Sequence, residues 1–173
     1  MISQDVSLSY KLLRYINSAM CGLNRQVDSI RHATVLVGFE KMQIWASLLL
    51  LSGFEPSKEV ILTGIVRARM CELLASASNL PHPERFFLAG LFSVLDVILD
   101  RPMEQIVSLL SLTEEIKDAL LYFQGEIGGV VRCVLAYERR QWAEAAACVR
   151  LAPKIIDRTH SEAFSWAHSI VGT

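Results

Sequence analysis

The sequence predicts an all-α protein, and three observations lead to that prediction. Apolar residues recur at helical spacing along most of the chain, with capping residues where helices would begin and glycines where several would end. No segment shows the regular alternation of apolar and polar residues that a half-buried strand requires. Hydrophobic residues make up 52% of the sequence and the mean hydropathy is +0.35, which suits a helical protein with a large core. We expect roughly eight to ten helices.

The length of the chain indicates one domain, and its net charge argues against binding to nucleic acid or to a membrane. The chain of 173 residues is long enough for one compact domain with a sizeable core. Its 17 basic and 18 acidic residues leave a net charge of −1, which gives no electrostatic reason to expect binding to nucleic acid or to a membrane. The high apolar content also predicts that part of the surface is apolar and available to a partner protein.

The cysteines and the apolar runs indicate a cytoplasmic protein. The four cysteines are Cys21, Cys71, Cys133 and Cys148. They form no CxxC motif, and no histidine lies at metal-ligand spacing from any of them, so we expect buried, reduced thiols. The longest apolar run, 44–51, is far shorter than the roughly 20 residues of a membrane-spanning helix. Residues 1–5 lack the basic region and apolar block of a signal peptide.

The first part of the chain predicts three helices, at 6–20, 29–37 and 39–51. In the first of them, apolar residues recur every four positions, which gives one continuous apolar face. Asp28 suits the cap of the second helix and Gly38 suits its end.

Three side chains in this part are candidates for interaction: Asn17, Ser18 and Trp45. Asn17 lies beside core positions, and a buried amide must find hydrogen-bond partners. We therefore expect Asn17 to tie the end of its helix to a neighbouring backbone, with a ligand-binding role as the alternative. Ser18 follows it directly, and Trp45 lies inside the helix predicted at 39–51.

The longest helix is predicted at 58–77, after Ser57. Apolar residues at helical spacing define its inner side. Arg67, Arg69 and Glu72 are charged residues of this helix and are expected on a solvated, salt-bridged face.

The stretch 86–96 is apolar on nearly every face, and a helix of that composition must be surrounded by others. Ala89 and Gly90 are small and let a neighbouring helix come close. One helix is predicted to run through this stretch to Leu99. Asp96 is expected to cap a helix or to pair with a neighbour.

The rest of the chain predicts helices at 103–110, from Thr113 onward, and at 130–139, 142–149 and 153–170. Gly125, Gly128 and Gly129 are predicted to form the turn before 130–139. They do not follow the GxxxxGK[ST] order of a phosphate-binding loop, and no strand precedes them.

Several of these stretches together resemble a known family. They read Asp-x-x-Leu-Ser-Tyr-Lys-Leu-Leu-Arg-Tyr-Ile-Asn-Ser-Ala at 5–19, Ser-Ile-Arg-His-Ala at 29–33, Leu-Val-Gly at 36–38 and Leu-Phe-Ser-Val-Leu-Asp at 91–96. This set, with Trp45, is similar to the HDOD family, the HD-related output domain of bacterial signalling proteins. It most narrowly resembles the HDOD half of proteins with an N-terminal EAL domain, the module associated with the messenger cyclic di-GMP.

The stretch 86–96 also resembles the signature helix of HD-type metal phosphohydrolases, in which Ala-Gly-Leu-Leu precedes a metal-binding His-Asp pair. At the positions of that pair this chain has Ser93 and Val94. Ser93 offers a neutral hydroxyl and Val94 has no donor atom, so neither replaces imidazole or carboxylate. The helix predicted at 58–77, where HD enzymes carry a further histidine, contains none. The resemblance implies no catalytic residue, no metal and no cofactor, with an Arg67 guanidinium in place of metal charge as an alternative.

The resemblance also implies a domain organisation. It spans 1–173 as one HDOD domain, with a bundle-like front at 1–55 and a degenerate HD-related rear at 56–173. A complete HDOD domain has about two further helices before the motif at 5–19, so we expect this sequence to be a fragment.

The expected function is a non-catalytic signalling module that binds signalling proteins and an N-terminal EAL domain through helical surfaces. Self-association into a homodimer through apolar surface on the N-terminal side is also expected. One alternative is a metal-dependent phosphohydrolase with atypical ligands drawn from Asp96, Asp100, His82 and Glu84. A sensor of a nucleotide or another small ligand is the third reading, and a shared fold does not decide among them.

Overall fold

The computed structural model describes residues 57–109 and 112–171. Within these ranges the chain forms eight helices and no strand, so the all-α prediction is confirmed for them. The helices are α3 (Lys58–Ala77), α4 (Pro83–Phe92), α5 (Leu95–Leu99), α6 (Met103–Leu109), α7 (Glu114–Tyr122), α8 (Gly125–Glu138), α9 (Trp142–Val149) and α10 (Pro153–Val171). The helices predicted at 6–20, 29–37 and 39–51 lie outside the described residues, with Cys21 and the candidates Asn17, Ser18 and Trp45.

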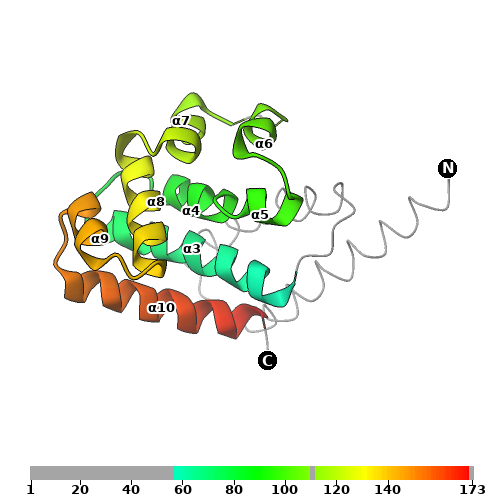
Figure 1. Ribbon diagram of the computed structural model, residues 1–173. Coiled ribbons are helices and arrows are strands. Elements are labelled where there is room, and N and C mark those ends of the chain that lie inside the picture. Colours follow the sequence, from blue (N-terminus) through cyan, green and yellow to red (C-terminus); the bar gives the residue numbers. More distant parts are fainter. Residues whose placement is uncertain (1–56, 110–111, 172–173) are drawn as a thin grey trace, which may run out of the picture.

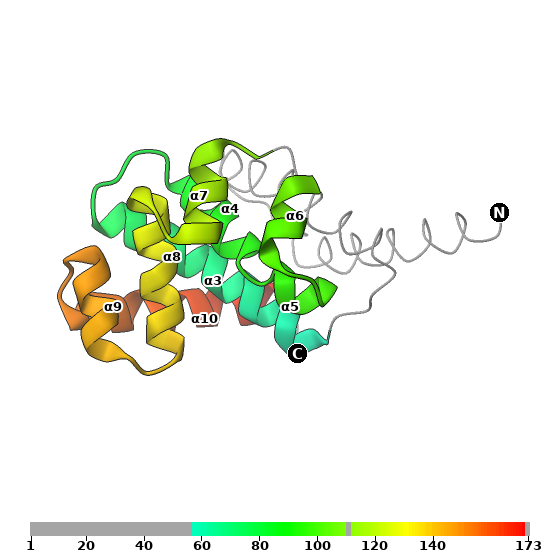
Figure 2. The same ribbon diagram turned by 45° about the horizontal axis from the view of Figure 1, so that its top comes forward.

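Helix α3 is the centre of this part of the protein. Helices α4, α8 and α10 all pack against it. Figure 1 shows α4 and α5 on one side of α3 and α10 on the other, running antiparallel to α3 along its length. The turned view in Figure 2 shows α7 and α6 beyond α4, and α9 beside α8. A helix enclosed in this way needs apolar side chains on more than one face.

The sequence of α3 meets that requirement. Ala68, Met70, Cys71, Leu74 and Ala75 are all fully buried. The Ser57 side chain accepts a hydrogen bond from the Val60 backbone N–H at 3.4 Å, which caps the first turn. The helix begins and ends where the sequence predicts, at 58 and 77.

Helices α3 and α4 touch backbone to backbone at Gly90. A Cβ atom added at Gly90 would lie 2.6 Å from the Arg67 carbonyl oxygen and 2.8 Å from the Ala68 Cα. Ala89, beside it, is fully buried. The prediction that two small residues allow a close helix contact here is therefore confirmed.

The prediction of one helix through to Leu99 is wrong. Helix α4 ends at Phe92, and α5 begins at Leu95 after a break at Ser93 and Val94. The Ser93 hydroxyl donates to the Gly90 carbonyl oxygen at 2.7 Å, while Val94 has a backbone φ of −111°. Serine side chains that bond nearby carbonyls compete with the helical ladder, and apolar periodicity does not reveal such a competition.

The prediction that Gly125, Gly128 and Gly129 form a turn is wrong for Gly128 and Gly129, which lie inside α8. Gly125 is the first residue of α8 and has φ 69°, so it still takes part in the turn. The turn lies one step earlier, where Phe123 adopts a left-handed conformation with φ 53°. A Cβ atom at Gly128 would lie 2.2 Å from the Phe123 carbonyl carbon, so this glycine lets the turn fold tightly onto the helix.

Helices α7 and α8 together, Glu114–Glu138, are long and apolar enough on average to cross a membrane. The bend at Phe123 divides this stretch into two helices, and half of its most apolar window is buried inside the protein. The stretch therefore has the character of core helices. Thr113 precedes α7 in an extended conformation, as predicted for a cap, but its side chain makes no capping hydrogen bond.

Candidate functional site

One arginine joins three elements of the fold. Arg67 lies on α3, and its Nε and Nη2 atoms donate to the Glu138 carboxylate, at the end of α8, over distances of 2.8 to 3.1 Å. Its Nη1 atom donates to the Ser93 carbonyl oxygen at 2.9 Å and to the Ser93 hydroxyl at 3.3 Å. The break between α4 and α5 and the end of α8 are therefore held to α3 by a single guanidinium.

The junction at Arg67 is mostly shielded from solvent. The Arg67 side chain is 15% exposed and that of Glu138 is 28% exposed. A two-pronged contact between guanidinium and carboxylate is among the stronger side-chain interactions, because both hydrogen bonds are charge-assisted. The Ser93 carbonyl lies just past the end of α4, where helix carbonyls lack partners of their own, and Arg67 supplies one.

The two positions that correspond to a metal-binding pair do not offer metal ligands. Val94 is 2% exposed and presents only hydrocarbon, whereas the Ser93 hydroxyl is bonded to the Gly90 carbonyl and to Arg67. Among the described residues, the carboxylate bonded at this junction is that of Glu138, and the Arg67 guanidinium already occupies it. A divalent cation here would lie beside a fixed positive charge, so these residues do not fit a metal ion.

The four candidate metal ligands of the phosphohydrolase alternative lie in two separate pairs. His82 and Glu84 flank the start of α4, with the His82 Nδ1 atom 3.2 Å from the Glu84 Oε1 atom. Asp96 and Asp100 lie beyond the other end of that ten-residue helix, which is about 15 Å long. Across 57–109 and 112–171, no group of three or more His, Cys, Asp or Glu side chains is placed to hold a metal ion.

Asp96 lies in the first turn of α5. Its Oδ1 atom accepts a hydrogen bond from the Val97 backbone N–H at 2.9 Å. The N-cap position of α5 is Val94 and carries no side-chain capping hydrogen bond, so Asp96 is not the cap of this helix. Asp96 and Asp100 also border a shallow depression of about 290 Å³ with Val97, Arg101 and Pro102.

The expectation of a solvated face at Arg67, Arg69 and Glu72 is half wrong. All three side chains are ion-paired, as expected, but they are only 15%, 24% and 14% exposed. The reason is that α8 and α10 cover this side of α3, which the sequence of α3 alone does not reveal. Arg69 pairs with Glu72 at 2.7 Å and stacks over Trp166 of α10 at 5.3 Å.

The three described cysteines are unpaired thiols. Cys71 and Cys133 are buried, as expected, whereas Cys148 is half-buried. Burial raises the pKa of Cys71 and raises that of Cys133 to about 12, so both thiols stay protonated near neutral pH. A protonated thiol is a poor nucleophile, which fits a packing role for these two side chains.

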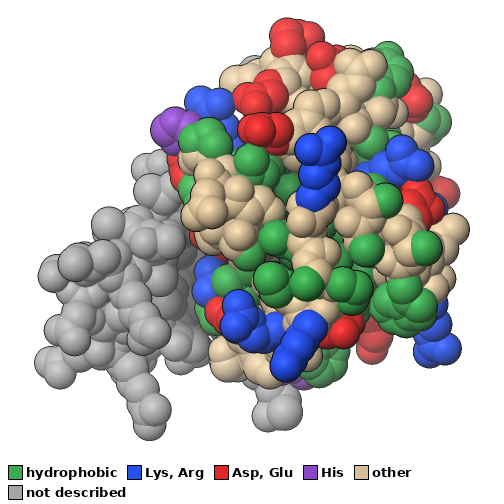
Figure 3. Space-filling view, turned by 90° about the vertical axis from the view of Figure 1, so that its left-hand side faces the viewer, with side chains coloured by type: hydrophobic (Ala, Val, Ile, Leu, Met, Phe, Trp, Pro, Cys, Tyr) green, Lys and Arg blue, Asp and Glu red, His purple; other side chains and the backbone are tan. Residues whose placement is uncertain are grey.

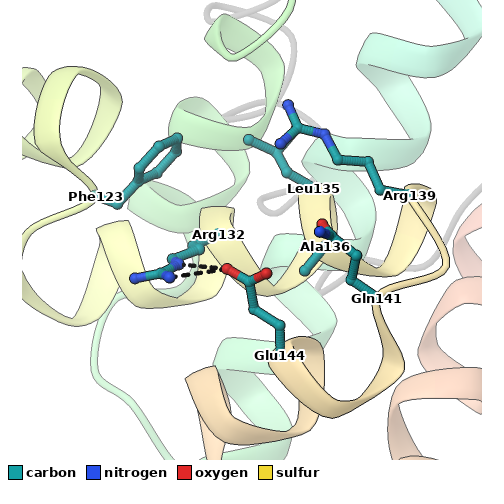
Figure 4. Close-up of a pocket in the computed structure, with 7 residues that line it drawn as sticks. All are labelled: Phe123, Arg132, Leu135, Ala136, Arg139, Gln141 and Glu144. Atoms are coloured by element: carbon teal, nitrogen blue, oxygen red, sulfur yellow. Dashed lines mark hydrogen bonds and ion pairs between the residues drawn. The ribbon is translucent and has the colours of Figure 1, made fainter.

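A hollow of about 270 Å³ lies between the α7–α8 turn, α8 and the start of α9. Its lining residues are Phe123, Arg132, Leu135, Ala136, Arg139, Gln141 and Glu144 (Figure 4). Sequence reasoning missed this feature, because its residues come from three elements and form no motif. The sequence itself offers one weak signal, the aromatic residue Phe123 in the short connection between two helices, which is not distinctive by itself.

Large apolar side chains are exposed at several points, among them Trp142 at 54% and Phe164 at 47%. Ring contacts link Trp142 to Tyr137 at 5.0 Å and Tyr137 to His160 at 4.9 Å. Figure 3 shows the side of the molecule at the left of Figure 1, where hydrophobic side chains lie between basic ones and acidic side chains gather toward the top of the view.

Comparisons with known proteins identify one domain family and two curated relatives. The HDOD domain model matches residues 1–142. The uncharacterized protein YuxH of Bacillus subtilis is 32% identical over 98% of this chain and 43% of its own length. The cyclic di-GMP phosphodiesterase CdgJ of Vibrio cholerae is 35% identical over 82% of this chain and 34% of its own length. The chain thus spans less than half of either relative, and no solved structure matches it.

Proposed function

We propose, from the premise that this chain belongs to the HDOD family, that it is a non-catalytic bacterial signalling module that acts by binding other proteins. The observation that carries the proposal is the Arg67 guanidinium between Ser93 and Glu138. A positively charged side chain thus occupies the place where an HD-type enzyme would need ligands for metal ions. The preserved helices then serve as a scaffold for binding surfaces, and among the described residues Ser93 and Val94 offer no metal ligand for hydrolysis.

A link to cyclic di-GMP signalling forms the second part of the proposal. CdgJ, by its name, is a cyclic di-GMP phosphodiesterase, and the similarity covers 34% of its length. We infer that this chain corresponds to the output half of such a protein, joined in the native molecule to an EAL domain. The phosphodiesterase activity would then belong to the part of the relative that this chain does not match.

Location and partners complete the proposal. The protein works in the cytoplasm, and its partners are signalling proteins and the attached EAL domain, with homodimer formation as a further association. Support comes from the net charge of −1, which favours neither nucleic acid nor an anionic membrane. Further support comes from the large exposed apolar side chains, Val97, Tyr122, Phe123, Trp142 and Phe164.

Affinity capture from bacterial cytoplasm, with the chain as bait, tests the proposal. We expect the same partner in repeated captures, and we expect the loss of that partner when Trp142 and Phe164 are both changed to Asp. In parallel, the purified chain with Mn²⁺ or Ni²⁺ should not hydrolyse bis(4-nitrophenyl) phosphate. Metal-dependent hydrolysis that disappears in Asp96→Asn or His82→Ala variants would overturn the proposal and favour the phosphohydrolase alternative.

A further inference from the structure

The hollow between the α7–α8 turn, α8 and α9 has an apolar floor and an aromatic wall. Leu135 and Ala136 of α8 form the floor, and the Phe123 ring, 41% exposed, stands at one side (Figure 4). Phe123 is the left-handed residue of the α7–α8 turn, and the tight contact of that turn with Gly128 fixes its backbone. The wall therefore does not depend on a mobile loop for its position.

The rim of the hollow carries an unbalanced positive charge. Arg132 is bonded to Glu144, with its Nε atom at 2.9 Å and its Nη2 atom at 2.8 Å from the same Oε1 atom. Arg139, on the opposite side in Figure 4, has no carboxylate partner within the described part of the chain. Because Arg132 holds Glu144, that carboxylate does not neutralise Arg139. Gln141 adds an amide donor and acceptor beside Arg139.

We propose that this hollow binds an acidic peptide segment of a partner protein, with one apolar side chain on the floor and a neighbouring carboxylate on Arg139. The inference rests on the proposed function, since it names the site and the chemistry of the partner for a protein-binding module. An exposed guanidinium is well suited to this task, because its planar fork matches the two oxygens of a carboxylate.

Size favours a peptide over an enclosed small ligand. Pockets for cofactors and other small molecules usually enclose about 300 to 1,000 Å³. This hollow offers about 270 Å³ and is open to solvent, which is room for one anchoring side chain. Single anchors of this kind, buried in a small pocket and flanked by polar contacts, dominate the affinity of many protein interfaces.

The experiment is a selection of random heptapeptides displayed on phage, with the 173-residue chain as target and its Arg139→Glu variant for counter-selection. We expect enriched peptides to carry Asp or Glu within two positions of Phe, Leu, Met or Trp. Synthetic copies should bind with at least tenfold lower affinity to Arg139→Glu and to Phe123→Ala, measured by fluorescence anisotropy. A tenfold loss corresponds to about 1.4 kcal/mol, which the loss of one charge-assisted hydrogen bond can supply.

The matched control is Arg101→Glu, the same charge change at an exposed arginine that borders the other depression. It should leave peptide affinity within about twofold, and circular dichroism should show native helix content for all variants. The proposal is overturned if no acidic motif is enriched, or if enriched peptides bind Arg139→Glu as tightly as the unchanged chain. Binding of a nucleoside triphosphate at the same place, lost with Arg139→Glu, would also overturn it.

The test separates this inference from the proposed function. If affinity capture recovers a partner and Arg139→Glu recovers it equally well, the protein-binding function stands and the hollow is not its site. If capture fails and metal-dependent hydrolysis is found, the proposed function itself fails.

Discussion

The ring of Trp166 on α10 meets the ring of Phe87 on α4 edge to face, with centroids 6.3 Å apart and an angle of 85° between the ring planes. Arg69 of α3 lies over the same indole at 5.3 Å. Trp166 therefore joins three helices, and α10 packs into the protein through this ring.

Replacing Trp166 with Ala should lower the free energy of unfolding by about 2 to 3 kcal/mol, because it removes a large half-buried ring and leaves a cavity. Urea denaturation followed by circular dichroism measures the change. Trp142→Ala, at a ring that is 54% exposed, is the control and should cost less than about 1 kcal/mol. An equal decrease in the free energy of unfolding for the two variants would contradict the inference that Trp166 joins three helices.

Replacing Arg67 with Met should destabilise the protein by about 2 to 3 kcal/mol, since it leaves the Glu138 carboxylate and the Ser93 carbonyl without their partner. The free energy of unfolding in urea is the measurement. The control is Arg85→Met, which breaks the Arg85–Glu115 pair. Those side chains are 50% and 52% exposed, and the expected cost is at most about 1 kcal/mol.

The Arg67 variant also supplies a double-mutant cycle with Glu138→Gln. If the two residues act on each other, the combined loss should be smaller than the sum of the single losses by about 0.5 to 2 kcal/mol. Additive losses would mean that the ion pair contributes nothing of its own to stability.

Gly90 and Gly129 should respond in opposite ways to Ala. At Gly90 the new Cβ would lie 2.6 Å from backbone, and neither helix can give way easily, so we expect a loss of about 1 to 3 kcal/mol. At Gly129 the nearest atom would be the Cys148 carbonyl oxygen at 3.5 Å, an ordinary contact. Because Ala favours the helix over Gly, Gly129→Ala should be neutral or stabilising by up to about 1 kcal/mol. Thermal unfolding of both variants decides the matter.

Ionisation of Tyr137 should lower the free energy of unfolding at alkaline pH. Burial and, after it, the hydrogen bond to Asp157 raise the pKa of Tyr137 from its ordinary 10.0 to about 12. The folded state thus favours the protonated phenol, so this contribution is complete below pH 10 and is lost as the pH rises from 10 to about 12. Urea midpoints measured from pH 8 upward should fall more steeply for the unchanged chain than for Tyr137→Phe. Tyr122→Phe, at an exposed ring, should follow the unchanged chain.

The sequence predicted the helices that have clear periodicity and clear ends. The bounds of α3 and α9 agree with the predicted ones, since Ser57 caps the first and Trp142 and Ala residues define the second. The break at Ser93 and the helical glycines of α8 were missed. In both places a contact with another part of the chain decides the local structure, and periodicity describes only a helix in isolation.

The candidate site was predicted in part. The sequence has Ser93 and Val94 where HD-type enzymes have a metal-binding His-Asp pair, so no metal ligand was expected there. The sequence also suggested, as an alternative, that the Arg67 guanidinium takes the place of the metal charge. Only the fold shows that Arg67 bonds to Ser93, because 26 residues separate them along the chain. The partner Glu138 is 71 residues from Arg67, and nothing in either neighbourhood connects the two.

The position of α10 on α3 also has a consequence for synthesis of the chain. Helix α3 ends at Ala77, whereas α10, which packs along α3, is complete only at Val171. At a ribosomal rate of roughly 5 to 20 residues per second, that interval lasts roughly 5 to 20 seconds. Throughout it, the nascent chain presents an uncovered apolar stripe to the chaperones around the ribosome.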